Sequence, residues 1–61
     1  MLQKIYKLLY FTDIGGKMVV NPQESEILWR NLEIYRKRLK RTKMRFKMET
    51  FENYTLIWRT Q

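Results

Sequence analysis

The chain has 61 residues, with 13 Lys and Arg against six Asp and Glu and a formal net charge of +7. It contains no Cys and no His, which excludes disulfides and the usual zinc sites built from thiolates and imidazoles. A chain this short forms at most one domain, so residues 1–61 are expected to fold as a single small basic domain.

The lack of cysteine fits a reducing compartment, and no stretch resembles a secretory signal or a membrane span. We therefore expect a soluble, cytoplasmic protein. Hydrophobic residues make up 44% of the chain and aromatic residues 15%, which is enough for a small core.

The first twenty residues carry two competing patterns. Four apolar residues fall at helical spacing: Leu2, Ile5, Tyr6 and Leu9. The stretch from Ile5 to Phe11 also suits a strand buried on both faces, because it is rich in Tyr, Ile and Phe. We favour the strand, followed by a turn at 13–16 and a short return strand from Lys17 to Val20. Residues 1–20 are thus predicted as a hairpin, with a helix as the alternative.

Residues 22–41 are predicted to form a helix. Asn21 can cap it, Pro22 suits the first helical position, and Glu24 lies three residues after the cap. One face carries an apolar stripe: Leu28, Leu32, Tyr35 and Leu39. The opposite face is charged: Glu26, Arg30, Glu33, Lys37 and Lys40. Two ion pairs at i,i+4 spacing are expected there, Glu26 with Arg30 and Glu33 with Lys37.

Residues 44–60 are predicted to form a β-hairpin, because apolar and polar residues alternate on both arms. A three-residue loop over 51–53, with Asn53 in the left-handed conformation, would pair Phe46 with Trp58 and Met48 with Leu56. In that register the opposite face carries three cations: Arg45, Lys47 and Arg59.

These elements predict an α+β fold in which one long amphipathic helix packs on a small antiparallel sheet, in the order ββαββ. If the first segment is a helix, the order becomes αβαββ, which would look more like a winged helix.

Residues suited to catalysis are scarce in this sequence. General acid-base chemistry most often uses histidine, which is absent, and the spacing of the six carboxylates suggests no catalytic pair. Asp13 before Gly15-Gly16 lacks the longer pattern of a phosphate-binding loop, so a hairpin turn is the better interpretation. We expect no enzyme activity, no cofactor and no metal.

The most informative feature is a run of cations from Arg36 to Lys47, which holds eight in twelve residues and no acid. Repulsion within such a run costs stability, so a polyanion site is favoured over a merely solvated helix end. The predicted nucleic-acid-binding residues are Arg36, Lys37, Arg38, Lys40, Arg41, Lys43, Arg45, Lys47 and Arg59. We expect a small nucleic-acid-binding protein, for DNA or RNA, that contacts phosphates with low sequence specificity.

Phe51 and Tyr54 flank the predicted hairpin tip, where burial in the core is difficult. They are candidates for stacking on bases or for anchoring a protein interface. The alternative function is therefore a small protein that binds and modulates a larger enzyme or complex, by analogy with phage-type regulators of host machinery, which are often this short. The basic surface would then steer it to an acidic partner. Attachment to a membrane is disfavoured because the core needs the apolar stripe, and a homodimer is plausible because an open sheet leaves two edges.

Overall fold

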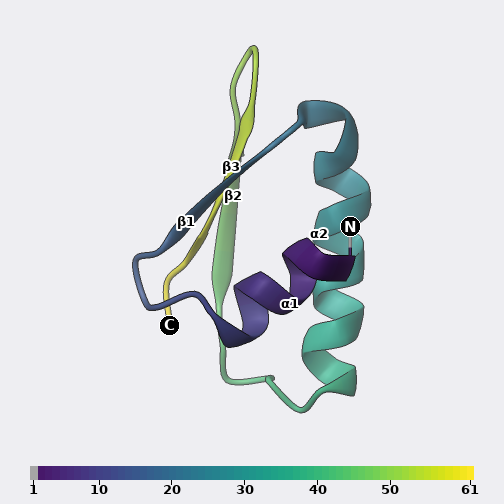
Figure 1. Ribbon diagram of the computed structural model, residues 1–61, viewed down its shortest axis with the longest axis vertical. Coiled ribbons are helices and arrows are strands. Elements are labelled where there is room, and N and C mark those ends of the chain that lie inside the picture. Colours follow the sequence, from purple (N-terminus) through teal and green to yellow (C-terminus); the bar gives the residue numbers. More distant parts are fainter. Residues whose placement is uncertain (1) are drawn as a thin grey trace.

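A computed structural model describes residues 2–61 and shows two layers, a sheet and a pair of helices that cover one of its faces (Figure 1). The elements in chain order are α1 (Leu2–Tyr10), β1 (Lys17–Val20), α2 (Pro22–Arg38), β2 (Phe46–Thr50) and β3 (Thr55–Arg59). The three strands are antiparallel in the order β1-β3-β2, so the last strand is central. The α+β class expected from the sequence is confirmed.

The N-terminal segment is a helix, so the expected ββαββ arrangement is not formed. In α1 the buried residues are Ile5, Leu8 and Leu9, a spacing that places them on one side of a helix, whereas a strand would alternate. The observed order is αβαββ, which is the alternative order. Lys17 to Val20 is a strand as expected, but it pairs with β3 because the first segment offers no partner.

In the turn before β1, the N–H groups of both glycines donate backbone hydrogen bonds. Gly15 has a φ of 88°, and the N–H of Gly16 donates to the carbonyl of Asp13 at 2.8 Å. The N–H of Gly15 donates to the carbonyl of Arg59 at 2.7 Å. This turn therefore extends the pairing of β1 with β3, in line with its interpretation as a turn.

Helix α2 begins where expected and ends three residues early, at Arg38 instead of residue 41. The side chain of Asn21 accepts a hydrogen bond from the N–H of Gln23, as an N-cap does. The predicted pair of Glu26 with Arg30 is present at 3.6 Å. Glu33, however, pairs with Arg36 at 3.0 Å and not with Lys37.

The hairpin forms with its register shifted by one residue from the prediction. Lys47 lies opposite Trp58, and Met48 lies opposite Ile57. The N–H of Phe51 donates to the carbonyl of Tyr54 at 2.7 Å, which closes a tighter loop than expected. Asn53 is not left-handed, since Lys40 is the only non-glycine residue with positive φ between residues 2 and 61.

This shift decides which face of β3 enters the core. Thr55 and Ile57 are fully buried against the helices, and the hydroxyl of Thr55 donates to that of Thr50 across the hairpin at 3.1 Å. Leu56 and Trp58 consequently point to the other face of the sheet.

The core lies between the sheet and the two helices and draws on nearly every element. Its buried hydrophobic residues are Ile5, Leu8, Leu9, Val20, Leu28, Leu32, Met44 and Ile57. Of the predicted stripe on α2, Leu28 and Leu32 are buried, while Tyr35 and Leu39 pack at the edge of the core. Neither α1 nor α2 is long and apolar enough to cross a membrane.

Candidate nucleic-acid interface

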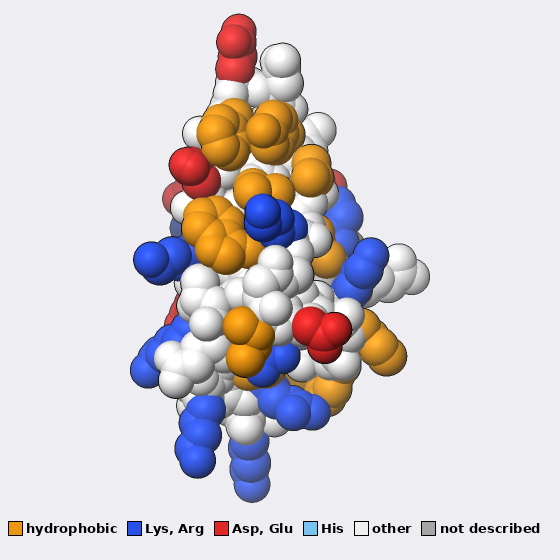
Figure 2. Space-filling view, turned by 90° about the vertical axis from the view of Figure 1, so that its left-hand side faces the viewer, with side chains coloured by type: hydrophobic (Ala, Val, Ile, Leu, Met, Phe, Trp, Pro, Cys, Tyr) orange, Lys and Arg blue, Asp and Glu red, His pale blue; other side chains and the backbone are white. Residues whose placement is uncertain are grey.

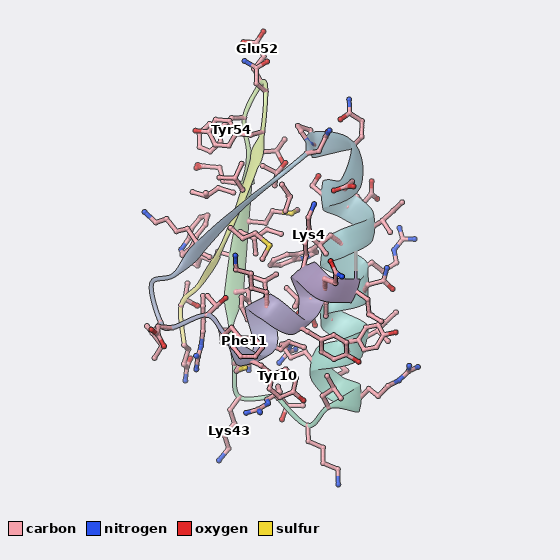
Figure 3. All side chains as sticks on the ribbon, viewed as in Figure 1. Lys4, Tyr10, Phe11, Lys43, Glu52 and Tyr54 are labelled. Atoms are coloured by element: carbon pink, nitrogen blue, oxygen red, sulfur yellow. The ribbon has the colours of Figure 1, made fainter. Side chains whose placement is uncertain are left out.

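Most of the predicted cations gather at one end of the molecule. The last turn of α2, the loop after it and the start of β2 meet there, at the lower end in Figure 1, and Figure 3 labels Lys43 at this end. We call this surface the basic end, and its exposed residues are Lys37, Arg38, Lys40, Arg41, Lys43 and Arg45. No Asp or Glu occurs between residues 34 and 48, so the sequence places no carboxylate within this segment.

Arg36 belongs to the predicted set but is buried, with 7% of its surface exposed. Its Nη1 atom donates to the carbonyls of Thr42 and Met44 at 2.7 and 3.2 Å, and Nη2 donates to the Glu33 carboxylate at 3.0 Å. The guanidinium therefore serves the fold, because it fixes the path of the loop that presents the surrounding cations.

Two of the exposed arginines lie on tyrosine rings. The guanidinium of Arg41 is 4.5 Å from the ring centre of Tyr10, and that of Arg38 is 5.2 Å from that of Tyr35. Tyr6 links the two rings, at 6.1 Å from Tyr10 and 6.3 Å from Tyr35. This cluster joins the end of α1 to the end of α2.

The end of α1 adds exposed aromatic side chains to the basic end, and the sequence analysis did not predict them there. Tyr10 and Phe11 are exposed, Phe11 by 81%, and Figure 3 shows both at the lower end of α1. They were missed because the segment was interpreted as a strand. The i,i+4 spacing of Tyr6 and Tyr10 was a signal for a helix, which would have placed Tyr10 and Phe11 at its C-terminal end.

Lys47 and Arg59 were expected to share one face of the sheet with Arg45, but the observed register places them on opposite faces. Lys47 lies on the face of the sheet away from the helices, across from Trp58. Arg59 lies on the opposite face, across from Phe46. Its Nη1 atom donates to the carbonyl of Thr12 at 2.9 Å and its Nε atom to that of Gln61 at 3.0 Å. The predicted strand face of three cations is therefore not formed.

Phe51 and Tyr54 lie at the far end of the molecule from most of the predicted cations. Their rings stack at 4.8 Å with an interplanar angle of 24°, and each residue is 41% exposed. Figure 3 shows Tyr54 and Glu52 at the top and Lys43 at the bottom. The tip aromatics are thus neighbours of an acidic residue, and not of the basic end.

The face of the sheet away from the helices forms a second surface, which we call the outer sheet face. The register places Trp58 between Lys17 and Lys47, and Leu56 between Val19 and Glu49. Figure 2 shows this side of the molecule, with hydrophobic side chains gathered over its upper part and an acidic side chain at the very top. Lys and Arg side chains lie over its middle and lower parts, and an acidic side chain also lies in the lower half.

The carboxyl group of Glu24 has a pKa that is shifted by a neighbouring lysine. The Nζ atom of Lys4 donates to Oε2 of Glu24 at 2.9 Å, which ties α1 to the first turn of α2. This hydrogen bond, together with the charge of Lys4, lowers the pKa of Glu24 below its ordinary value of 4.5. Among residues 2–61 no group of three or more acidic, His or Cys side chains is arranged to hold a metal ion.

Comparisons with known protein families, with curated proteins and with solved structures found no match for this chain.

Proposed function

We propose that this protein binds nucleic acid, and that the basic end makes most of its contacts with backbone phosphates. The observation that carries the proposal is the gathering of six exposed cations at one end, in a segment without a carboxylate. A surface of this kind attracts a polyanion over long range and can neutralise several phosphates at once.

The composition of the basic end favours weak sequence specificity. Phosphate contacts give affinity and position, whereas contacts with base edges give specificity. Residues 34–48 contain no Asn or Gln, the side chains that read adenine. The exposed ring of Phe11 would stack on an unpaired base if one is present.

The αβαββ order does not supply the recognition device that a winged-helix-like interpretation would imply. A helix-turn-helix needs two consecutive helices joined by a short turn, and here β1 separates α1 from α2. The face of α2 toward the sheet is occupied by the core residues Leu28 and Leu32. We therefore propose that loop and helix-end cations contact the nucleic acid, without a helix inserted into a groove.

Salt dependence tests this proposal. If four to six cations contact phosphates together, log K against log salt should have a slope of roughly −3.5 to −5.5 on duplex DNA. Replacing Lys37, Lys40 and Lys43 with Gln should flatten the slope by about one unit for each phosphate that no longer has a lysine partner. These lysines are chosen because Arg38 and Arg41 also pack on tyrosines.

The matched control replaces Lys4, Lys7 and Arg30 with Gln, which removes the same charge outside the basic end. Its slope should stay close to that of the unchanged protein. Equal effects of both triple variants would contradict the proposal, since only net charge would then matter. Retention of a protein after nuclease treatment of a lysate, with weak binding to DNA and RNA, would favour the alternative of an acidic protein partner that this chain modulates.

A further inference from the structure

The outer sheet face exposes more apolar surface than a solvated face needs. Val19 is 63% exposed, and Phe51 and Tyr54 are 41% exposed each. Leu56 and Trp58 are only partly buried and do not belong to the side chains packed against the core. Contiguous apolar surface of this kind on a small protein marks a site of association.

Charges are unevenly distributed along the outer sheet face. Its cations lie toward the basic end: Lys17, Lys47 and Arg45. Its acids, Glu49 and Glu52, lie toward the hairpin tip, with Glu52 at the tip itself (Figure 3). A second copy turned end for end would bring the acidic end of one face onto the basic end of the other.

We infer that the outer sheet face binds a second copy of this chain, with the strands of the two copies antiparallel and a two-fold axis near the pair Met48–Ile57. With that axis, residues equally far before and after the pair face each other, because the strands run in opposite directions. Lys47 then faces Glu49 of the second copy, and Trp58 faces Leu56 of the second copy.

The same axis also accounts for the two ends of the face. Arg45 lies three residues before Met48 and Phe51 three residues after it, so Arg45 of one copy faces the Phe51 ring of the other. A guanidinium over an aromatic ring is a favourable contact. The antiparallel arrangement thus gives both the apolar and the charged residues of this face a partner of suitable chemistry.

A second copy explains this face better than a strand of nucleic acid does. Glu49 and Glu52 would repel phosphates beside the stacked rings of the tip, and the aliphatic side chains of Val19 and Leu56 offer no ring for a base. A parallel arrangement of two copies is also disfavoured, because it would bring cations onto cations. The inference does not depend on the proposed function, since of the exposed residues of the basic end only Arg45 also belongs to the outer sheet face.

The expected dimer is modest in size. Figure 2 looks onto the longest and shortest dimensions of the molecule, which are 33 and 15 Å between Cα atoms. A face of this extent lies at the small end of specific interfaces, which bury about 800 Å² on each partner. We expect a reversible dimer with a dissociation constant on the order of micromolar.

Sedimentation equilibrium of the unchanged protein and of two matched variants tests the position of the interface. Leu56→Glu places a charge in the centre of the face and should weaken the dimer by about a hundredfold or more. Ile34→Glu is the control, because Ile34 is an exposed aliphatic residue on α2, in the other layer. It should leave the dissociation constant unchanged, and circular dichroism checks that both variants fold.

Charge exchange tests the antiparallel geometry. Lys47→Glu alone and Glu49→Lys alone should each weaken the dimer by about tenfold, because like charges then face each other. An equimolar mixture of the two variants should associate as a heterodimer about as tightly as the unchanged protein. The double variant, with both exchanges in one chain, should form a homodimer again.

Several outcomes would overturn the inference. One is a monomer at millimolar concentration, and another is an equal effect of Leu56→Glu and Ile34→Glu. Loss of binding to single-stranded oligothymidylate in Leu56→Glu, with the unchanged protein monomeric, would assign the face to nucleic acid. None of these outcomes involves the lysine variants of the basic end, so the proposed function stands or falls separately.

Discussion

At the scale of single residues, the buried guanidinium of Arg36 shows how a cation can be misassigned from a charge run. Seven of the eight cations between residues 36 and 47 are exposed, and the eighth is buried and donates to two loop carbonyls and to the partly exposed Glu33 carboxylate. Nothing in the run distinguishes Arg36 from Arg38 or Lys40. The difference arises from the helix phase, which turns Arg36 toward the same side as the core residue Leu32.

We predict that Arg36→Ala costs about 3 kcal/mol of folding stability, because it leaves buried carbonyls without donors. Arg36→Lys should recover only part of this loss, since an ammonium cannot reproduce the forked geometry of the guanidinium. Urea denaturation measures both. Lys37→Ala, an exposed change in the same turn, should stay within about 0.5 kcal/mol. Full recovery by lysine would show that charge alone suffices.

The pair of Lys4 and Glu24 gives a prediction on pH dependence. Since the folded pKa of Glu24 is lowered by its hydrogen bond with Lys4, the pair stabilises the fold at neutral pH. That contribution is fully present above the ordinary pKa of 4.5 and is lost as the pH falls through the lowered folded pKa.

In an NMR titration, the Glu24 carboxyl should titrate below its ordinary pKa in the unchanged protein and return toward that value in Lys4→Gln. The stability difference between the two proteins should be present at pH 7 and shrink with acid. A Glu24 pKa that is the same in both proteins would contradict the assigned cause.

At the scale of elements, the end of α2 is the boundary that the sequence predicts least well. The N–H groups of Lys40 and Arg41 donate to the carbonyls of Lys37 and Arg36 at 3.1 and 2.7 Å, and Lys40 has a φ of 58°. This is a Schellman ending, in which the left-handed position usually carries glycine. The sequence has lysine there, so no local signal marked the end of the helix.

We predict that Lys40→Gly is more stable than Lys40→Ala by about 1 kcal/mol, because only glycine adopts the left-handed conformation without a steric cost. Both variants lose the same charge, so the comparison isolates the backbone. Thermal and urea denaturation of the two proteins measure the difference. Greater stability of the alanine variant would mean that the residue is not left-handed in solution.

The other elements differ in how far their sequence determines them. The start of α2 was predictable because Asn21 and Pro22 are strong local signals. The nature of α1 was ambiguous because Tyr, Ile and Leu suit both a helix and a buried strand, and the contact with α2 decides between them. The hairpin register was missed by one residue because alternation alone cannot fix which face of β3 is buried.

At the scale of the whole molecule, the sequence predicted that cations would gather on one surface, but not how they would be distributed between the basic end and the two faces of the sheet. The exposed cations of the basic end come from one continuous segment, so their proximity follows from the sequence itself. The positions of Lys47 and Arg59 on opposite faces depend on the register, and the exposure of Tyr10 and Phe11 depends on the packing of α1. The outer sheet face could not be predicted, because it joins residues from all three strands.

The central place of β3 in the sheet also has a consequence for biosynthesis. Both β1 and β2 pair only with β3, which is made after them, so no part of the sheet can form while the chain is still being extended through residue 54. Once β3 emerges, its short loop to β2 closes at a much smaller entropic cost than the long connection back to β1. The hairpin should therefore assemble first and offer a free edge to β1. Until then no sheet covers the sides of the two helices that carry the core residues.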